Sequence, residues 1–210
     1  MKILQVTTLT VFPFLLKAQN AAEVFVGDKG VAFELLSSND LDTAHKWNLF
    51  TIARFETNYK KDNPSSPDFY TINPLLTYGF TKNFGLSAGG HYEFGKFIPQ
   101  VGVNVTYFNK KGLFLNVFPT VSIEDKPNLE LFGIINYSPR ISDNWKIYSQ
   151  IIVISNFNTK EHNISNQLIR LGLDYKSFQF GIGGNIKEFS SQWLYSGNYG
   201  IFFRKNFSIY

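Results

Sequence analysis

Few of the residue types that carry catalysis stand in a useful arrangement. His91 and Glu93 are two positions apart, so on a strand they share a face, where a carboxylate-oriented imidazole could activate a hydroxyl group. No serine stands out as the nucleophile for this pair, and the other histidines, His45 and His162, lie in separate segments. Metal-ligand spacing is absent, and the sequence has no cysteine. We therefore expect no enzyme activity, no catalytic residues, no metal and no cofactor.

Phosphate and nucleic-acid chemistry is not indicated either. The glycine-rich segment 181–184 lies inside an alternating stretch with no helix after it, unlike a nucleotide loop. The net charge is +4, but the Lys and Arg residues are scattered and form no basic stripe or tail. We expect no nucleic-acid partner.

Charged and polar residues recur at alternate positions of apolar stretches, which places them on one face of extended strands. If that face encloses a lumen, its charges need partners or water. The candidate lumen-lining residues are Arg54, Glu56, His91, Glu93, Gln100, Glu130, Arg170, Asp174, Lys187 and Arg204.

These ten residues have two alternative roles in a lumen. His91, Glu93 and Glu130 fall at one height, and Arg170 and Lys187 fall at a similar height on later strands, so opposite walls could set a transverse field across a narrow water path. Alternatively, ion pairs fill the interior and make it tight to solutes. We favour the second, because a barrel of about ten strands has little spare interior.

The elements that must position these side chains are strands. From Trp47 to the C-terminus, about ten stretches alternate apolar with polar residues. The alternation is clearest over residues 84–94 and 97–107 and in the last three stretches. It is blurred at Phe50 and Ile52, and the stretch 145–156 is apolar on both faces at its centre. Pro74 lies in the least regular stretch, where it removes a ladder donor.

Composition favours a sheet that closes on itself in a membrane. Hydrophobic residues make up 44% of the 210-residue chain and charged residues only 17%, yet after the leader no run of about 18 apolar residues could form a membrane helix. Backbone groups in hydrocarbon must all be paired. The sequence therefore predicts an all-β fold, an antiparallel up-and-down transmembrane β-barrel of about 10 strands, with 12 as the alternative.

The chain divides into three parts. Residues 1–18 have a lysine, an apolar stretch and a small residue at the end, which predicts a secretory signal peptide. Residues 19–45 are either a periplasmic segment, which lies outside or plugs the base, or an extra hairpin that turns at residues 27–30. Residues 46–210 are the barrel. Tight turns at alternate junctions predict a periplasmic rim, where an even strand number also puts both termini.

The apolar face points outward in this interpretation. The polar face carries many glycines, which suit a narrow interior that is small and hydrophilic, whereas the apolar face carries rings near strand ends. These rings predict an aromatic girdle of Trp47, Tyr59, Tyr92, Tyr107, Tyr137, Trp145, Tyr175 and Trp193. A soluble lipid-carrying barrel with an apolar lumen is the alternative, but its wet face would need more charges.

Residues 47–207 resemble a small Gram-negative outer-membrane β-barrel protein of the porin-like class. The strand–turn–strand unit at residues 78–86 (YGFTKNFGL) is similar to those of such proteins, and residues 198–207 (NYGIFFRKNF) resemble the terminal-strand signal that the barrel assembly machinery reads. Lys205 departs from that signal, which has a hydrophobic residue there. The resemblance implies location in the Gram-negative outer membrane, with membrane lipids, lipopolysaccharide and the assembly machinery as partners, and a monomer.

The expected function is a structural role or limited passive, porin-like transport, with the solute undetermined. An adhesion or binding barrel acting through external loops such as residues 61–68 is an alternative. An outer-membrane barrel hydrolase is a further one, which the missing nucleophile disfavours.

Overall fold

The computed structural model describes residues 18–60, 68–93, 95–109, 111–158, 162–189 and 194–209. These contain twelve strands: β1 (Ala18–Gly27), β2 (Gly30–Asp40), β3 (Trp47–Asn58), β4 (Phe69–Gly79), β5 (Phe84–Glu93), β6 (Lys96–Phe108), β7 (Leu113–Ser122), β8 (Leu129–Tyr137), β9 (Trp145–Phe157), β10 (His162–Tyr175), β11 (Phe178–Phe189) and β12 (Leu194–Ile209). Within the described residues, no helix is long and apolar enough to cross a membrane.

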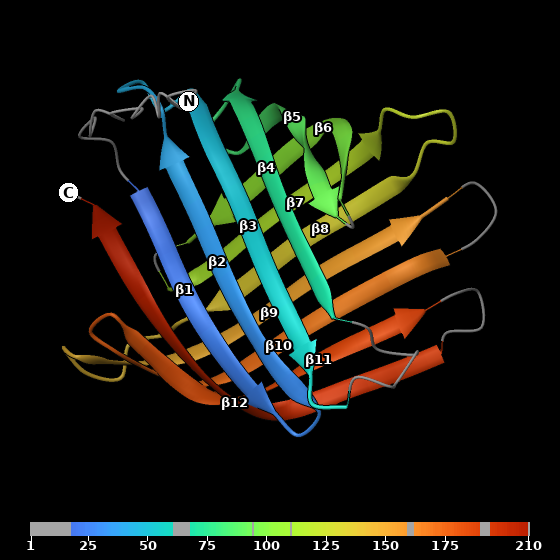
Figure 1. The fold of residues 1–210 in the computed structure, drawn as a ribbon. Coiled ribbons are helices and arrows are strands. Elements are labelled where there is room, and N and C mark those ends of the chain that lie inside the picture. Colours follow the sequence, from blue (N-terminus) through green and yellow to red (C-terminus); the bar gives the residue numbers. More distant parts are fainter. Residues whose placement is uncertain are drawn as a thin grey trace, which may run out of the picture.

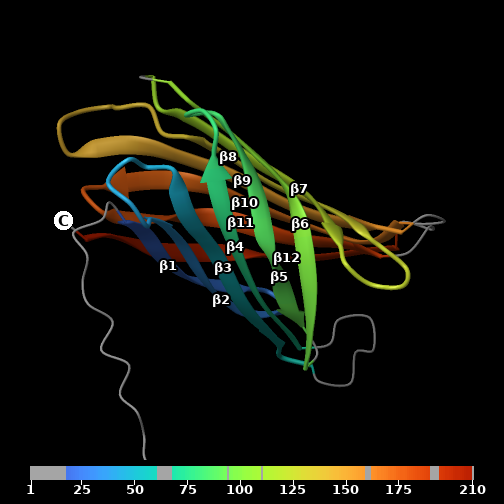
Figure 2. The same cartoon turned by 90° about the horizontal axis from the view of Figure 1, so that it is seen from above.

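Each strand pairs antiparallel with its neighbours in the sequence, and β1 pairs with β12 to close the barrel. Closure requires tilted strands. In Figure 1, β1–β4 lie in front of β7–β11, which run at a large angle to them, and Figure 2 shows the two walls facing each other. The predicted fold class is confirmed.

The preferred count of ten strands is wrong, and the alternative of twelve is right. Residues before Trp47 form the hairpin β1–β2, which completes the wall between β3 and β12. The alternation is weak there because both faces carry apolar residues: Ala32 and Leu36 point inward, and Phe33 and Leu35 point outward. The predicted signal peptide lies outside the described residues, apart from Ala18, where β1 begins.

The connections sort into two rims. We call the end where β1 begins and β12 ends the terminal rim, and the opposite end the far rim. Short turns at the terminal rim are fixed locally: Asn109 accepts hydrogen bonds from the backbone N–H of Lys111 and Leu113, and Gly112 follows with φ +89°. The longest connection, between β3 and β4, lies at the far rim.

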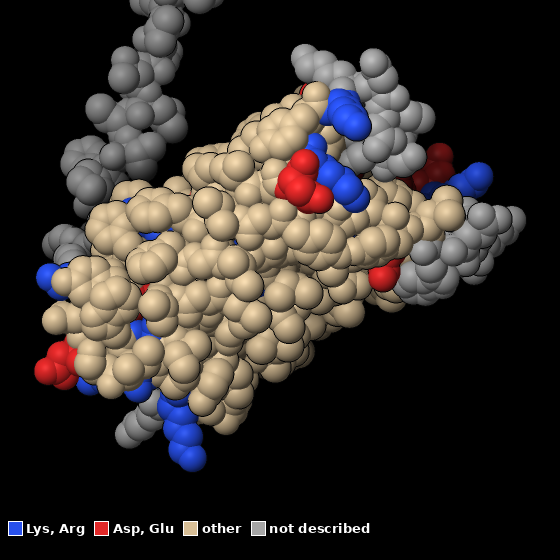
Figure 3. Space-filling model, turned by 90° about the horizontal axis from the view of Figure 1, so that it is seen from below, with Lys and Arg blue, Asp and Glu red and all other residues tan. Residues whose placement is uncertain are grey.

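Outward side chains are mainly Leu, Ile, Val, Phe and Tyr, and many of these large apolar groups are exposed. In the view of Figure 3, uncharged side chains cover the middle of the wall, and Lys, Arg, Asp and Glu lie mostly toward its ends. A soluble protein of this size would not expose so large an apolar band. The wall therefore suits lipid contact.

Candidate functional site

The interior at mid-height is filled by apolar side chains, which we call the septum. Its buried members come from six strands: Phe50, Ile52, Leu75, Phe118, Phe132, Ile134, Ile152 and Leu168. The Phe50 ring lies 5.0 Å from the Phe118 ring and 5.3 Å from the Phe132 ring. Because β4, β5 and β6 separate β3 from β7 in the wall, these contacts cross the lumen.

The septum corrects the expectation of a hydrophilic interior. Ile152 is 0% exposed, and Ile52 and Leu75 are 1% exposed. A water-filled passage would leave such inward side chains accessible. The polar expectation fails at mid-height because large apolar groups from opposite walls meet there and pack as a core.

Beside the septum, seven charges form an alternating row, which we call the arginine–glutamate network. In order, it runs through Arg170, Glu23, Arg204, Glu34, Arg54, Glu56 and Lys187. The N···O distances along the row are 2.8, 2.9, 3.0, 3.3, 2.8 and 3.0 Å. Each glutamate thus lies between two cations, which offsets the desolvation of its carboxylate.

Strand register builds this row. Glu23 on β1 is directly opposite Glu34 on β2, and Arg204 on β12 is opposite Glu23. Two like charges face each other across neighbouring strands, which is unfavourable without a cation between them. Arg204 bridges both carboxylates and also donates to the Tyr148 hydroxyl oxygen at 2.6 Å. Its guanidinium therefore links β12 to three other strands, β1, β2 and β9, inside the lumen.

Arg170 on β10 joins the same row. In the wall, β10 and β1, which carries Glu23, lie on opposite sides of β12. Its guanidinium carbon lies 4.5 Å from the Phe25 ring centroid, and Nε donates to Glu23 at 2.8 Å. A Cβ at Gly183 would come within 2.8 Å of the Arg170 Cδ. The glycine thus leaves room for the arginine to lie flat against the wall.

A second buried polar cluster lies on the other side of the lumen. Gln100 and His91 are hydrogen-bonded at 2.9 Å, and Asn73 donates to Glu130 at 3.2 Å. His91 Nδ1 is 3.8 Å from Glu130, and Nε2 is 4.0 Å from Glu93. The structure therefore brings together His91, Glu93 and Glu130, which the sequence placed at one height. The ion pairs of these three residues are with one another.

The cations expected on the facing wall are also paired. Arg170 and Lys187 contact Glu23 and Glu56, so neither stands as an unpaired charge toward the His91 cluster. Of the ten candidate lumen residues, all but the half-buried Glu93 are buried. Asp174 lies apart from the network and accepts a hydrogen bond from Gln179 at 3.0 Å.

Sequence reasoning missed Glu23, Glu34 and Tyr148. A signal for the two glutamates was present: they are equidistant from the turn at residues 28–29, so a tight hairpin sets them opposite each other. Tyr148 had no such signal, because its partner Arg204 is far along the chain.

Between the septum and the terminal rim lies a vestibule of two cavities. The first, about 430 Å³, is lined by β2–β8 and two of their turns, and the second, about 410 Å³, lies toward β8–β12 and β1. Leu36, Phe114 and Ile134 border both. In the far half, a space of about 10 Å³ between Asn58, Lys187 and Asn198 holds at most a water. The two vestibule cavities thus lie toward the terminal-rim end of the interior.

The candidate girdle residues occupy two levels. Trp47, Tyr107, Tyr137, Trp145 and Tyr175 lie at the terminal rim, and Tyr59 and Tyr92 lie at the far rim. All seven are exposed apart from Tyr175, which is half-buried and lies 4.6 Å from the Trp145 ring. Trp193 lies outside the described residues.

The described residues include a hydrogen-bonded serine–histidine pair. His162 Nε2 and Ser165 Oγ are 2.8 Å apart, and Ser165 also donates to Ser155 at 2.7 Å. All three side chains are buried, and none borders either vestibule cavity. Among the described residues, no group of three or more His, Cys, Asp or Glu residues could hold a metal ion.

No family model matches the sequence, and no curated protein matches it. Among solved structures, the chain is similar to the NanC porin, with a TM-score of 0.50 and 9% identity over 90% of this chain and 98% of that one. The KdgM porin in complex with disordered oligogalacturonate has a TM-score of 0.49 and 12% identity, over 90% and 99% of the chains. For the COG4313 outer membrane channel from Pseudomonas putida F1, the values are 0.45 and 7%, over 91% and 95%. The likeness to the NanC porin concerns the fold alone: this chain has the barrel fold of a porin.

Proposed function

We propose that the chain is an integral barrel of the Gram-negative outer membrane whose passive, porin-like transport is limited by a closed mid-height lumen. The observation that carries this proposal is the burial of inward side chains at that level, with Ile152 0% and Ile52 1% exposed. A continuous water path would have to pass them. In the resting state, the barrel therefore has a structural role or passes solutes only when the septum moves.

The septum and the arginine–glutamate network close the lumen in different ways. The septum excludes water because its apolar side chains cross from wall to wall. The arginine–glutamate network fills the space beside it with paired charges. Opening requires both to rearrange, or at least the septum to thin. This supports limited transport over a permanently open pore.

The outside supports a membrane location. Exposed apolar side chains such as Ile182 and Ile201 occupy the middle of the strands, with rings such as Trp47 and Tyr92 near the rims. We propose membrane lipids and lipopolysaccharide as contacts of this band, and recognition of β12 by the barrel assembly machinery. Heat-modifiable migration on a gel tests the folded barrel, because a closed barrel keeps its shape in mild detergent until it is heated.

Single-channel recording in planar bilayers tests the closed lumen. The native barrel should show little or no steady conductance. The double variant Phe50→Ala/Phe118→Ala removes two septum rings that stack across the lumen, so it should conduct. Phe180→Ala, on the outward face of β11, is the matched control and should behave like the native barrel. Large steady conductance of the native barrel would contradict the proposal.

We also propose a non-catalytic role. The support is the burial of Ser165 and His162, which leaves no described cavity at which a substrate carbonyl could approach the hydroxyl. Mass spectrometry of lipopolysaccharide and phospholipid after incubation with the folded barrel is the test. A deacylated or shortened product that disappears in the Ser165→Ala variant would refute this part of the proposal.

A further inference from the structure

The first vestibule cavity has the chemistry of a ligand site. Its inner end is apolar and aromatic, because Phe50, Phe114 and Ile134 face it from the septum side. Its walls carry hydroxyl and amide groups, and its mouth at the terminal rim carries Lys46 and Lys82. A volume of about 430 Å³ is within the range of cavities that hold small organic molecules.

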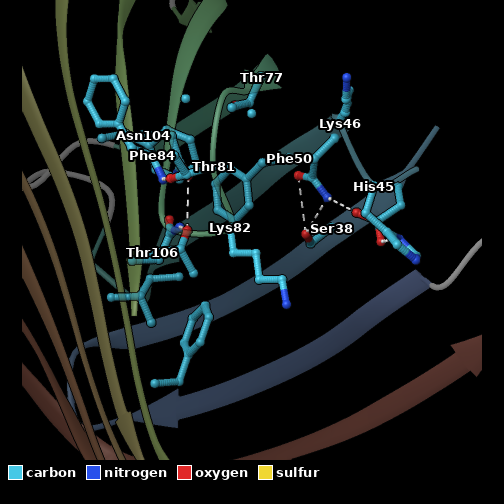
Figure 4. Close-up of a pocket in the computed structure, with 18 of the residues that line it drawn as sticks. Ser38, His45, Lys46, Phe50, Thr77, Thr81, Lys82, Phe84, Asn104 and Thr106 are labelled. Atoms are coloured by element: carbon cyan, nitrogen blue, oxygen red, sulfur yellow. Dashed lines mark hydrogen bonds and ion pairs between the residues drawn. The ribbon is translucent and has the colours of Figure 1, made fainter. Parts of the chain in front are cut away.

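The cationic groups at the mouth are not neutralised by neighbouring carboxylates. Asp40, the acidic residue that lines the cavity, is paired with His45 at 2.6 Å. Within the described residues, no carboxylate oxygen lies within 4.0 Å of the ammonium group of Lys46 or Lys82. In Figure 4, Lys82 extends between His45 on one side and Thr106 on the other. Figure 4 also shows the Lys46 side chain pointing away from Lys82, so an anionic group at the mouth would meet the ammonium group of Lys82.

A third feature lies at the apolar end, where Asn116 is between Phe114 and Phe118 on the inward face of β7. The Asn116 side chain is 7% exposed and borders the cavity; its Nδ2 donates to the Thr106 hydroxyl at 2.6 Å, while its buried Oδ1 has no hydrogen-bond partner. A buried acceptor without a donor is unfavourable. A ligand that carries a hydroxyl group could satisfy it.

We propose that this cavity binds a small aromatic carboxylate that carries a hydroxyl group. The ring packs on the phenylalanine side of the septum, the carboxylate meets Lys82, and the hydroxyl donates to the Asn116 Oδ1. An aromatic body fits better than an aliphatic one, because the rings of Phe50, Phe114 and Phe118 border the cavity and aromatic rings pack favourably on one another. The ligand enters from the terminal rim and does not need to cross the septum.

Equilibrium dialysis against the folded barrel in lipid nanodiscs tests the site, with 6-hydroxy-2-naphthoate as the probe and empty nanodiscs as the blank. We expect saturable binding of one probe per barrel, weaker binding of 2-naphthoate, and only non-saturable partition of naphthalen-2-ol. Added salt should weaken binding of the carboxylate, because the mouth contact is between exposed charges.

Single-residue variants separate the contributions of the ion pair and of the hydroxyl contact to the affinity. Lys82→Gln should lower the affinity for both carboxylates by about two- to fivefold, which is the range of an exposed ion pair. Asn116→Leu should lower the affinity for 6-hydroxy-2-naphthoate to that of 2-naphthoate. Lys126→Gln, in the β7–β8 connection at the far rim, is the charge-matched control and should bind like the native barrel.

Heat-modifiable migration confirms that each variant is folded before it is dialysed. Probe uptake equal to that of empty nanodiscs, or an affinity that Lys82→Gln and Asn116→Leu leave unchanged, would overturn the proposal. Dialysis measures binding without any conductance, so an open lumen in the recordings above would leave this result standing.

Discussion

Replacement of Arg204 by methionine should destabilise the barrel strongly. The guanidinium is buried and contacts Glu23 at 2.9 Å, Glu34 at 3.0 Å and the Tyr148 hydroxyl at 2.6 Å. Removing one partner of a buried ion pair costs about 3–5 kcal/mol, because the remaining charge stays buried. Glu23 retains Arg170 and Glu34 retains Arg54, so we place the loss at the lower end, about 3 kcal/mol, or roughly 100-fold in the folding equilibrium.

The like-charge pair that Arg204 bridges makes the prediction sharper. In Arg204→Met, Glu23 and Glu34 face each other on adjacent strands with no cation between them. Adding Glu34→Gln removes that repulsion, and the remaining charges still pair as Arg170–Glu23 and Arg54–Glu56. The double variant should therefore be more stable than Arg204→Met, by about 1–2 kcal/mol for coupled neighbours.

Urea unfolding of the barrel from lipid vesicles, followed by tryptophan fluorescence, measures both effects. Arg140→Met is the control, since Arg140 is exposed in the β8–β9 turn and should change stability by less than about 0.5 kcal/mol. If Arg204→Met lost no more than this control, or if Glu34→Gln made it less stable still, the network would not be what stabilises this wall.

Three further predictions concern the wall, the network and a turn. A Cβ on Gly200 would lie 2.0 Å from the Val26 carbonyl oxygen, whereas one on Gly133 meets nothing within 4 Å, so Gly200→Ala should reduce the folded yield in a heat-modifiable migration assay and Gly133→Ala should not. Tyr148→Phe removes one acceptor of a hydrogen bond from the bridging arginine and should cost about 1–3 kcal/mol in the same urea assay, with no loss if that bond is unimportant. In the β7–β8 turn, the Ser122 hydroxyl donates to Glu124 at 2.9 Å and lowers the pKa of that carboxyl below its ordinary value. The stabilisation is present above the unfolded pKa and is lost as pH falls through the lower folded pKa, so NMR titration should find a pKa that rises in Ser122→Ala; an unchanged pKa would contradict this assignment.

The outer face of the wall could be predicted because all its side chains face the same environment, the membrane lipid. Strands such as β5 and β11 alternate large apolar and small or polar residues over most of their length, with Phe178, Phe180 and Ile182 outward and Gln179 inward. Period two fixes which residues share a face, and local turn residues fix where strands end. Neither depends on how the barrel is shaped in cross-section.

The pairing inside the lumen could not be predicted, because it depends on closure. Arg170 and Glu23 are 147 positions apart and meet only after β1 has paired with β12. Strand counting gave heights along the axis, which brought His91 and Glu130 to one level, but it gave no information on which walls approach each other. The preferred count of ten strands also left out β1 and β2, and therefore Glu23 and Glu34, which these strands supply to the network.

The irregularities in the alternation carry the functional information. Phe50 and Ile52 interrupt the alternation of β3, and β9 is apolar on both faces at its centre, where Ile152 lies. All three belong to the septum. A permanently water-filled barrel would keep polar residues inward along the whole strand, since each inward position would face solvent. Departures from period two at the same height on opposite walls therefore indicate a lumen closed by side chains, and this reasoning extends to any barrel in which such inward apolar positions lie on facing strands.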